Sequence, residues 1–167
     1  MTPEREVADT LELHLRFLDR YRGVIEAKLT GLSDADLRNS RLPSGWAPLE
    51  LLKHLIFMER RWLRWGFTAE QVDRPWGDSA DDPEGRWTLD PDDTLESLLA
   101  QLHAGGEFTR QVVRGADPAT VAPVGGRFGP DDRPTLNWIL FHVLEEYARH
   151  AGHLDIVREL VDGVTGE

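Results

Sequence analysis

The sequence contains no cysteine, no long apolar run and fewer basic than acidic side chains. Without cysteine, disulfides, thiolate metal sites and cysteine nucleophiles are excluded, so any thiol chemistry needs a thiol from a small molecule. No apolar run approaches the ~20 residues that a membrane-spanning helix requires. The 19 Lys and Arg against 30 Asp and Glu give a net charge of −11. Because nucleic acids and anionic membranes bind clustered basic side chains, we expect neither as a partner.

The remaining composition is that of an ordinary folded protein. Hydrophobic residues make up 40% of the 167, which is enough for one core, and we expect residues 1–167 to form a single domain. The N-terminal stretch MTPEREVADTLELHL is charged and amphipathic. It lacks the apolar region and the small-residue cleavage site of a secretion signal, so we expect a cytoplasmic protein.

Apolar residues recur at helical spacing in four segments, and no segment of comparable length alternates with period two. This pattern predicts an all-α protein. Pro48 is expected to open the second long helix and Gly66 to close it, while Gly105 and Gly106 are expected to interrupt the third. A short helical turn capped by Ser33 is expected after the first. The predicted long helices span residues 3–29, 48–65, 94–114 and 135–163.

Four helices of this length predict a four-helix bundle, and the connector between the second and third helices predicts its topology. Residues 67–93 exceed the ~12 to 15 residues that are typical of irregular loops. A connector that long can run the length of a helix, so the second and third helices can lie parallel, in an up-down-down-up bundle. Within it, residues 73–93 carry eight acidic and two basic side chains. They are either a solvated linker or a lid over a pocket.

Two ionisable side chains of the last helix, Glu146 and His150, fall inside its apolar stripe. A buried carboxylate needs a positive partner, and a divalent metal ion is the simplest one. Being four residues apart, Glu146 and His150 can offer an oxygen and a nitrogen to the same ion. His54, at the inner edge of the second helix, can supply a second nitrogen. This His2Glu set suits Zn²⁺ with coordination positions left open, and Ni²⁺ or another divalent ion is an alternative.

Arg22 offers another explanation for the buried carboxylate. It falls on the apolar stripe of the first helix and either pairs with Glu145 or Glu146, or supports the site as a partner of the ligands or as an anchor for a substrate carboxylate. Glu145 and Arg149 are four residues apart and are expected to pair with each other. The further candidates at the margin of the last stripe are His142, Glu145, Arg149 and His153.

Small and aromatic residues bear on where a pocket could lie. Gly106 and Thr109 face inward on the third helix, where large apolar side chains are expected, and either make room for a pocket or allow close helix packing. Four tryptophans flank the helix ends, where the mouth of a pocket would lie. These are Trp46, Trp62, Trp65 and Trp138.

The stretches KHLIFMERRW around His54 and HVLEEYARHAGHLDIVREL around Glu146 and His150 resemble a known group of proteins. This is the DinB-like superfamily of damage-inducible four-helix proteins, and within it the actinobacterial branch similar to mycothiol-dependent S-transferases and maleylpyruvate isomerase. The resemblance covers nearly the whole chain, including PSGWAPLELLKHL. It implies an up-down-down-up bundle with a divalent ion, usually zinc, held by His54, Glu146 and His150.

The resemblance also implies an activity. In this family the metal binds a low-molecular-weight thiol such as mycothiol as the thiolate, which then attacks an electrophile. We therefore expect a thiol S-transferase that serves detoxification, with a thiol and an electrophile as partners and, by family habit, a homodimer. Two alternatives stay open. One is a metal-dependent hydrolase that activates water at the same site, and the other is a non-enzymatic stress protein that binds a metal or small ligand.

Overall fold

The computed structural model describes residues 6–79 and 85–166, and within them it is a bundle of long helices. These ranges contain no β-strand, only two isolated bridges. The predicted all-α bundle is therefore confirmed. A short helix, α2 (Asp34–Arg38), follows the first long one, and a π-helix, η2 (Arg61–Phe67), continues the second. The four long helices are α1 (Thr10–Leu29), α3 (Pro48–Arg60), α4 (Leu95–Val113) and α5 (Leu136–Asp162).

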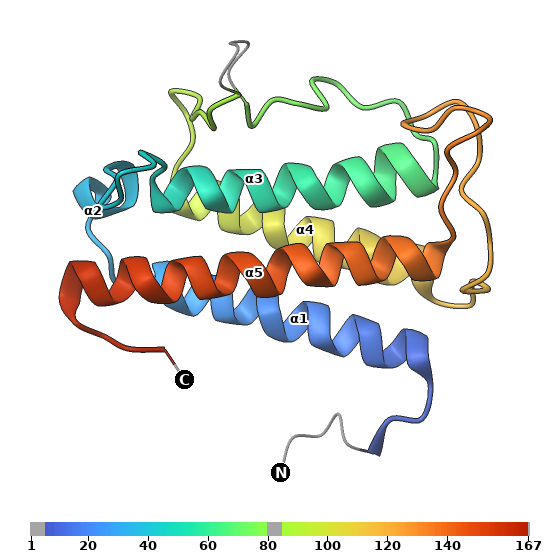
Figure 1. Cartoon of the computed structure of the whole chain (residues 1–167), viewed down its shortest axis with the longest axis horizontal. Helices are drawn as coiled ribbons and strands as arrows, with labels where there is room; N and C mark the ends of the chain where they lie inside the picture. Colours follow the sequence, from blue (N-terminus) through green and yellow to red (C-terminus); the bar gives the residue numbers. More distant parts are fainter. Residues whose placement is uncertain (1–5, 80–84, 167) are drawn as a thin grey trace.

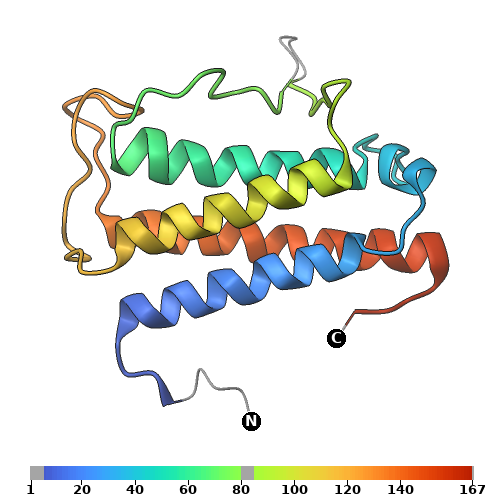
Figure 2. The same cartoon turned by 180° about the vertical axis from the view of Figure 1, so that it is seen from behind.

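The helices run up-down-down-up, as the connector length predicts. In Figure 1, α1 and α5 run from right to left, whereas α3 and α4 run from left to right. Seen from behind in Figure 2, α4 and α1 form the near layer of the bundle. The connector between η2 and α4 returns along the whole length of α3, which is why α3 and α4 can be parallel. Among the described residues, no helix has the length and apolar character needed to cross a membrane.

The helix boundaries correct two predictions. Helix α1 begins at Thr10 and not at Pro3, which lies outside the described residues, because the Asp9 side chain caps the helix by accepting from the Glu12 amide. Helix α4 is not interrupted at Gly105 and Gly106, since its backbone stays helical through both. The caps at Ser33 and Thr135 and the left-handed Gly163 after α5 agree with the sequence pattern.

The second long helix ends in a different type of helix from the one predicted. It does not close at Gly66 but changes at Arg61 from α to π, and it ends at Phe67. A π-helix is rare and widens the turn, so it changes which side chains of residues 61–67 face the same way. Gly66 lies inside this segment, where a Cβ atom would come within 3.0 Å of the Phe128 ring. The glycine therefore allows the loop before α5 to pack against η2.

A core of leucine, isoleucine and valine side chains fills the bundle. Each fully buried side chain of this kind contributes about 1.5–3 kcal/mol by leaving water. The core extends through every long helix, so the ionisable groups on inward faces are surrounded by apolar side chains. Representative members with no exposed surface are Leu18, Ile25, Leu55, Leu98, Ile139 and Val143.

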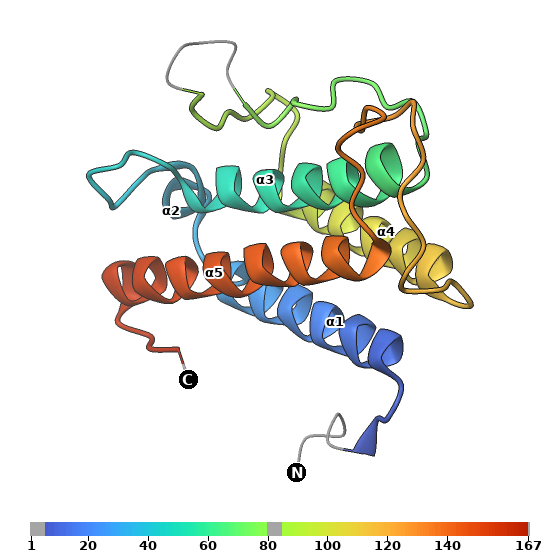
Figure 3. The same ribbon diagram turned by 45° about the vertical axis from the view of Figure 1, so that its right-hand side comes forward.

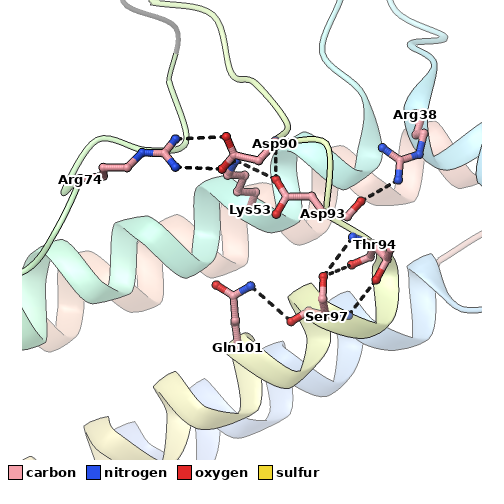
Figure 4. Close-up of polar contacts among 8 residues, drawn as sticks. All are labelled: Arg38, Lys53, Arg74, Asp90, Asp93, Thr94, Ser97 and Gln101. Carbon is pink, nitrogen blue, oxygen red and sulfur yellow. Dashed lines mark hydrogen bonds and ion pairs between the residues drawn. The ribbon is translucent and has the colours of Figure 1, made fainter.

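The end of the connector is tied to the bundle by a buried lysine on α3. The Nζ atom of Lys53 lies 3.0 Å from Asp90 and 2.7 Å from Asp93, and Asp90 also pairs with Arg74 at 3.2 Å (Figure 4). Arg38 donates to the Asp93 carbonyl oxygen at 2.6 Å. These charged side chains, which the composition alone would place in solvent, thus anchor the connector over α3.

Candidate metal site

Three side chains predicted as metal ligands converge between α3 and α5. One ligand atom each from His54, Glu146 and His150 lies within 4.8 Å of the other two. Glu146 Oε2 is 3.3 Å from His150 Nε2 and 3.7 Å from His54 Nε2. His54 comes from the second turn of α3, while Glu146 and His150 lie one turn apart on α5. The antiparallel packing of α3 against α5 brings the two helices together at this level.

The connector supplies a partner that orients His54. The Asp78 carboxylate is fully buried and lies 3.0 Å from His54 Nδ1. Because a carboxylate only accepts, this contact places the proton on Nδ1 and leaves the lone pair of Nε2 facing Glu146. Burial works to raise the pKa of Asp78, but hydrogen bonds from His54 and Arg61 outweigh it and hold that pKa below its ordinary value. Asp78 is therefore a carboxylate, as this role needs.

An aromatic ring from the same connector covers the site. Trp87 stacks on the His54 imidazole with ring centroids 4.3 Å apart and planes at 19°, and it meets the His150 ring edge-on at 5.5 Å. With Trp46 it also lines a neighbouring cavity of about 510 Å³. The connector thus contributes both Asp78 and Trp87 to the surroundings of His54, and this part of it is more than a solvated linker.

His150 is held in the neutral form. Burial, and next the proximity of His54, lower the pKa of His150 from 6.5 to about 4. At neutral pH its ring therefore carries a lone pair that can bind a cation. His153 Nδ1 lies 3.2 Å from His150 Nδ1, so His153 is the one marginal histidine of α5 that the structure places against a predicted ligand.

The Glu146 carboxylate lacks a positive partner of its own. Within residues 6–79 and 85–166, no group donates a hydrogen bond to it and no arginine or lysine pairs with it. The nearest nitrogens belong to two imidazoles, of which one has its proton on the far side and the other is neutral. Two imidazole nitrogens and one carboxylate oxygen that face one another form a donor set that fits a divalent cation.

Arg22 points into the bundle as predicted, but its partner is neither Glu145 nor Glu146. Its Nε donates to Glu59 Oε2 at 3.2 Å, its Nη2 contacts the other Glu59 oxygen, and its Nη1 donates to Asp19 at 2.9 Å. Burial works to lower the pKa of Arg22, yet the charge and hydrogen bond of Glu59, together with the charges of Tyr147 and Asp19, outweigh it and raise that pKa. Arg22 therefore belongs to a second buried cluster, away from the candidate metal site.

This second cluster also explains two small residues on α4. The Thr109 hydroxyl donates to Glu59, and so does the Tyr147 hydroxyl at 2.7 Å. A Cβ atom on Gly106 would lie 3.1 Å from Arg22 Cζ, so the glycine makes room for the guanidinium. The inward-facing small residues thus make room for this ion pair, and each also lines a cavity, Thr109 one of about 430 Å³ and Gly106 one of about 280 Å³.

The other marginal candidates lie away from the site. His142 stacks on Trp138, with centroids 5.3 Å apart, and meets Trp62 edge-on at 4.4 Å. Glu145 and Arg149 are both exposed, and no ion pair joins them in the part of the chain that the structure describes. The predicted Glu145–Arg149 pair is therefore wrong, because on this solvated face neither side chain is held toward the other.

The sequence model of the mycothiol S-transferase family matches residues 13–163, which is nearly the whole chain. The chain belongs to the mycothiol S-transferase family. This membership confirms the resemblance to the DinB-like superfamily that the motifs around His54 and Glu146 carry. Among curated proteins, none matches the sequence.

A solved structure supports the fold of this family member. The chain is similar to the crystal structure of a conserved protein from Enterococcus faecalis, with a TM-score of 0.67 and 15% sequence identity. The match covers 95% of this chain and 100% of that one. At this identity the likeness concerns the arrangement of the helices alone.

Sequence reasoning missed three residues beside these clusters: Asp78, Trp87 and Glu59. Asp78 and Trp87 lie in the connector, where no periodicity tells which of many polar and aromatic side chains turns inward. Glu59 did carry a signal. It is preceded and followed at helical spacing by Leu52, Leu55, Ile56 and Leu63, a pattern that indicates a buried position.

Proposed function

We propose that this protein is a metal-dependent S-transferase that joins a low-molecular-weight thiol, mycothiol or a similar one, to an electrophile. Membership of the mycothiol S-transferase family supports the reaction class. The observation that carries the proposal is the convergence of His54, Glu146 and His150, whose ligand atoms lie within 4.8 Å of one another. Homodimer formation, a cytoplasmic location and a single domain over residues 1–167 stay predictions.

The three side chains would hold the ion through two imidazole nitrogens and one carboxylate oxygen. Zn²⁺ suits this set, and Ni²⁺ or another divalent ion is an alternative. A bound divalent cation lowers the pKa of a thiol, so that the thiolate is the prevailing form at neutral pH. Three protein ligands leave room for the sulfur of the co-substrate, which is typical of a catalytic rather than a structural site.

The protein side chains prepare this chemistry before any substrate arrives. Asp78 keeps the proton of His54 on Nδ1, which leaves its Nε2 available, and burial keeps His150 neutral, so one nitrogen of its ring has a free lone pair. Trp87 lies flat against the His54 ring and shields it from water. In the reaction the thiol loses its proton and its sulfur forms a bond to the electrophilic carbon. The displaced group leaves with the bonding electron pair, or, in an addition, the adjacent atom takes up a proton.

A conjugation assay tests the proposal. Zinc-loaded protein is mixed with mycothiol and 1-chloro-2,4-dinitrobenzene, and the conjugate is followed by absorbance and mass spectrometry. We expect turnover by the wild type, loss in His150→Ala and Glu146→Gln, and retention in His103→Ala, whose exposed ring lies 2.9 Å from Glu26. Hydrolysis of an ester or amide by zinc-loaded protein that forms no conjugate would contradict the transferase and favour the hydrolase.

A further inference from the structure

A second candidate site lies at the other end of the same face, where η2 meets the loop before α5. A cavity of about 780 Å³ is formed there by indole rings, Phe128 and the Arg127 side chain. Figure 3 shows this loop rising beside the start of the connector at the η2 end of the bundle. Two of the tryptophans, Trp76 and Trp138, have about half of their surface exposed, at 53% and 51%. Exposed indoles around a cavity are typical of a ligand site.

The Arg127 guanidinium in this cavity is unpaired among the described residues, and Asp132 at the rim acts on it through its charge alone. No residue in the described ranges accepts a hydrogen bond from it or forms an ion pair with it, and its Nη1 atom is buried. It lies instead over two indole faces, with Cζ 4.2 Å from the Trp62 centroid and 5.4 Å from that of Trp76. A guanidinium that is partly removed from water without an anion is costly to the fold, so this half-buried group is poised to accept one.

The backbone around Arg127 is built for this placement. The Arg127 amide donates to the Trp65 carbonyl oxygen at 3.1 Å, which fixes the loop to η2. Gly126 permits this contact, because a Cβ atom there would come within 3.0 Å of backbone atoms of Trp65 and Ala69. The π-helix supplies Trp62 and Trp65 to the same cavity. Since π-helical turns are frequent at functional sites, their presence here is a second, independent indication.

The charge pattern favours an anion over a cation. Asp131, Asp132 and Arg133 also line the cavity, but all three are exposed at its rim. Two of the indoles that line the cavity, Trp62 and Trp76, already have the Arg127 guanidinium over their rings. The charged group that a ligand meets among the aromatic rings is therefore positive.

We propose that this cavity binds an aromatic carboxylate, with Arg127 paired to the carboxylate and the exposed rings of Trp76 and Trp138 packed against the aromatic part. Arg–carboxylate pairing is bidentate and charge-assisted, which gives this ligand its specificity. The site shares no residue with the His54–Glu146–His150 set and does not depend on the proposed transferase activity. It is a separate binding site on the same face of the bundle.

Calorimetric titration with three matched probes tests the site. The probes are 2-naphthoate, neutral 2-naphthalenemethanol and the cationic 2-naphthyltrimethylammonium, each titrated into metal-free and zinc-loaded wild type. We expect 2-naphthoate to bind in both forms, at least about tenfold more tightly than the alcohol or the cation. Absence of 2-naphthoate binding, equal affinity for the alcohol, or tighter binding of the cation would each overturn the proposal.

Variants separate Arg127 from general effects on the fold. Arg127→Gln should weaken 2-naphthoate binding at least about tenfold, Arg127→Lys should keep part of the affinity, and the rim variant Arg133→Gln should keep nearly all of it. His150→Ala should bind as the wild type does. Because Arg127 is unpaired, the melting temperature of Arg127→Gln should be no lower than that of the wild type. Unchanged 2-naphthoate binding by Arg127→Gln would overturn the proposal.

Discussion

Two inward-facing carboxylates of this bundle, Glu59 and Glu146, differ in the groups that surround their negative charge. Glu59 is 3% exposed and accepts hydrogen bonds from Arg22, Thr109 and Tyr147. Glu146 keeps 20% side-chain exposure and faces two imidazole nitrogens at 3.3 and 3.7 Å. Neighbouring positions on α5 thus serve different clusters, since Tyr147 points to Glu59 while Glu146 points to the histidines.

The difference distinguishes a structural ion pair from a candidate ligand set. A carboxylate whose lone pairs are all taken by fixed donors, including an arginine, has no capacity left for a metal ion. A carboxylate that faces two imidazole nitrogens, without an arginine or lysine partner among the described residues, has that capacity. Burial of a carboxylate alone therefore does not indicate a metal site, whereas the identity of its neighbours does.

Removal of the Glu59 carboxylate should have the largest effect on stability. In Glu59→Ala the buried Arg22 loses its main partner, so we expect the unfolding free energy to fall by about 3–5 kcal/mol. Urea denaturation of the metal-free protein measures it. The matched change Glu146→Ala should alter stability by no more than about 0.5 kcal/mol. Equal losses in the two variants would mean that both carboxylates are structural.

Zinc should stabilise the chain through Glu146 and not through Glu59. At a free zinc concentration a hundred times Kd, binding to one site raises the unfolding free energy by about 2.7 kcal/mol. We expect this rise in the wild type and in Tyr147→Phe, which alters only the Glu59 cluster. The rise should vanish in Glu146→Ala and His150→Ala at the same zinc concentration, and its persistence in both would place the zinc elsewhere.

Asp78 should matter for zinc affinity although it is not a ligand. Loss of a carboxylate that orients a ligating histidine weakens metal binding about 10- to 100-fold, which corresponds to about 1.4–2.8 kcal/mol. We expect this for Asp78→Asn in competition with a chromophoric chelator. Asp90→Asn is the control, because Asp90 belongs to the same connector but contacts Lys53. Equal affinities in the two variants would show that the Asp78–His54 contact has no bearing on the metal.

The smallest expected effect on stability concerns the two adjacent glycines of α4. A Cβ atom added at Gly105 would meet no other atom within 4 Å, so Gly105→Ala should raise the unfolding free energy by about 0.5–1 kcal/mol through helix propensity. Gly106→Ala should give no such gain, because the new methyl group meets the guanidinium of Arg22, which Glu59 and Asp19 hold in place. Thermal and urea denaturation measure the stability of both variants. Equal gains in unfolding free energy would mean that the Arg22 side chain moves aside at little cost.

The elements that sequence predicts well are those with helical periodicity. The bundle and the facing positions of His54, Glu146 and His150 follow from residue spacing within helices, because register decides which side chains face the core, and the topology follows from the length of the connector. The π-helix does not follow from spacing. Its residues RWLRWGF show no pattern that separates a π-helix from an α-helix, and its first residue contacts a distant segment, with Arg61 Nη2 3.1 Å from Asp78.

Pairing between segments was the harder part of the candidate site. The inward direction of Arg22 was predictable from its own helix, but the choice among Glu59, Glu145 and Glu146 as its partner depends on how α1, α3 and α5 rotate against one another. Asp78 could not be placed at all, because it lies in a connector without periodicity and its burial is decided by Arg61 and His54. A partner search over all inward-facing acids, Glu59 included, would have improved the prediction.

The central claim is that His54, Glu146 and His150 together bind one divalent metal ion. Elemental analysis of protein equilibrated with zinc and freed of excess metal tests it most directly. The claim predicts about one zinc ion for each wild-type chain and for each Gly105→Ala chain, and close to none for Glu146→Ala or His150→Ala, all of them folded. A wild type without zinc, or equal zinc contents in the wild type and in both ligand variants, would contradict it.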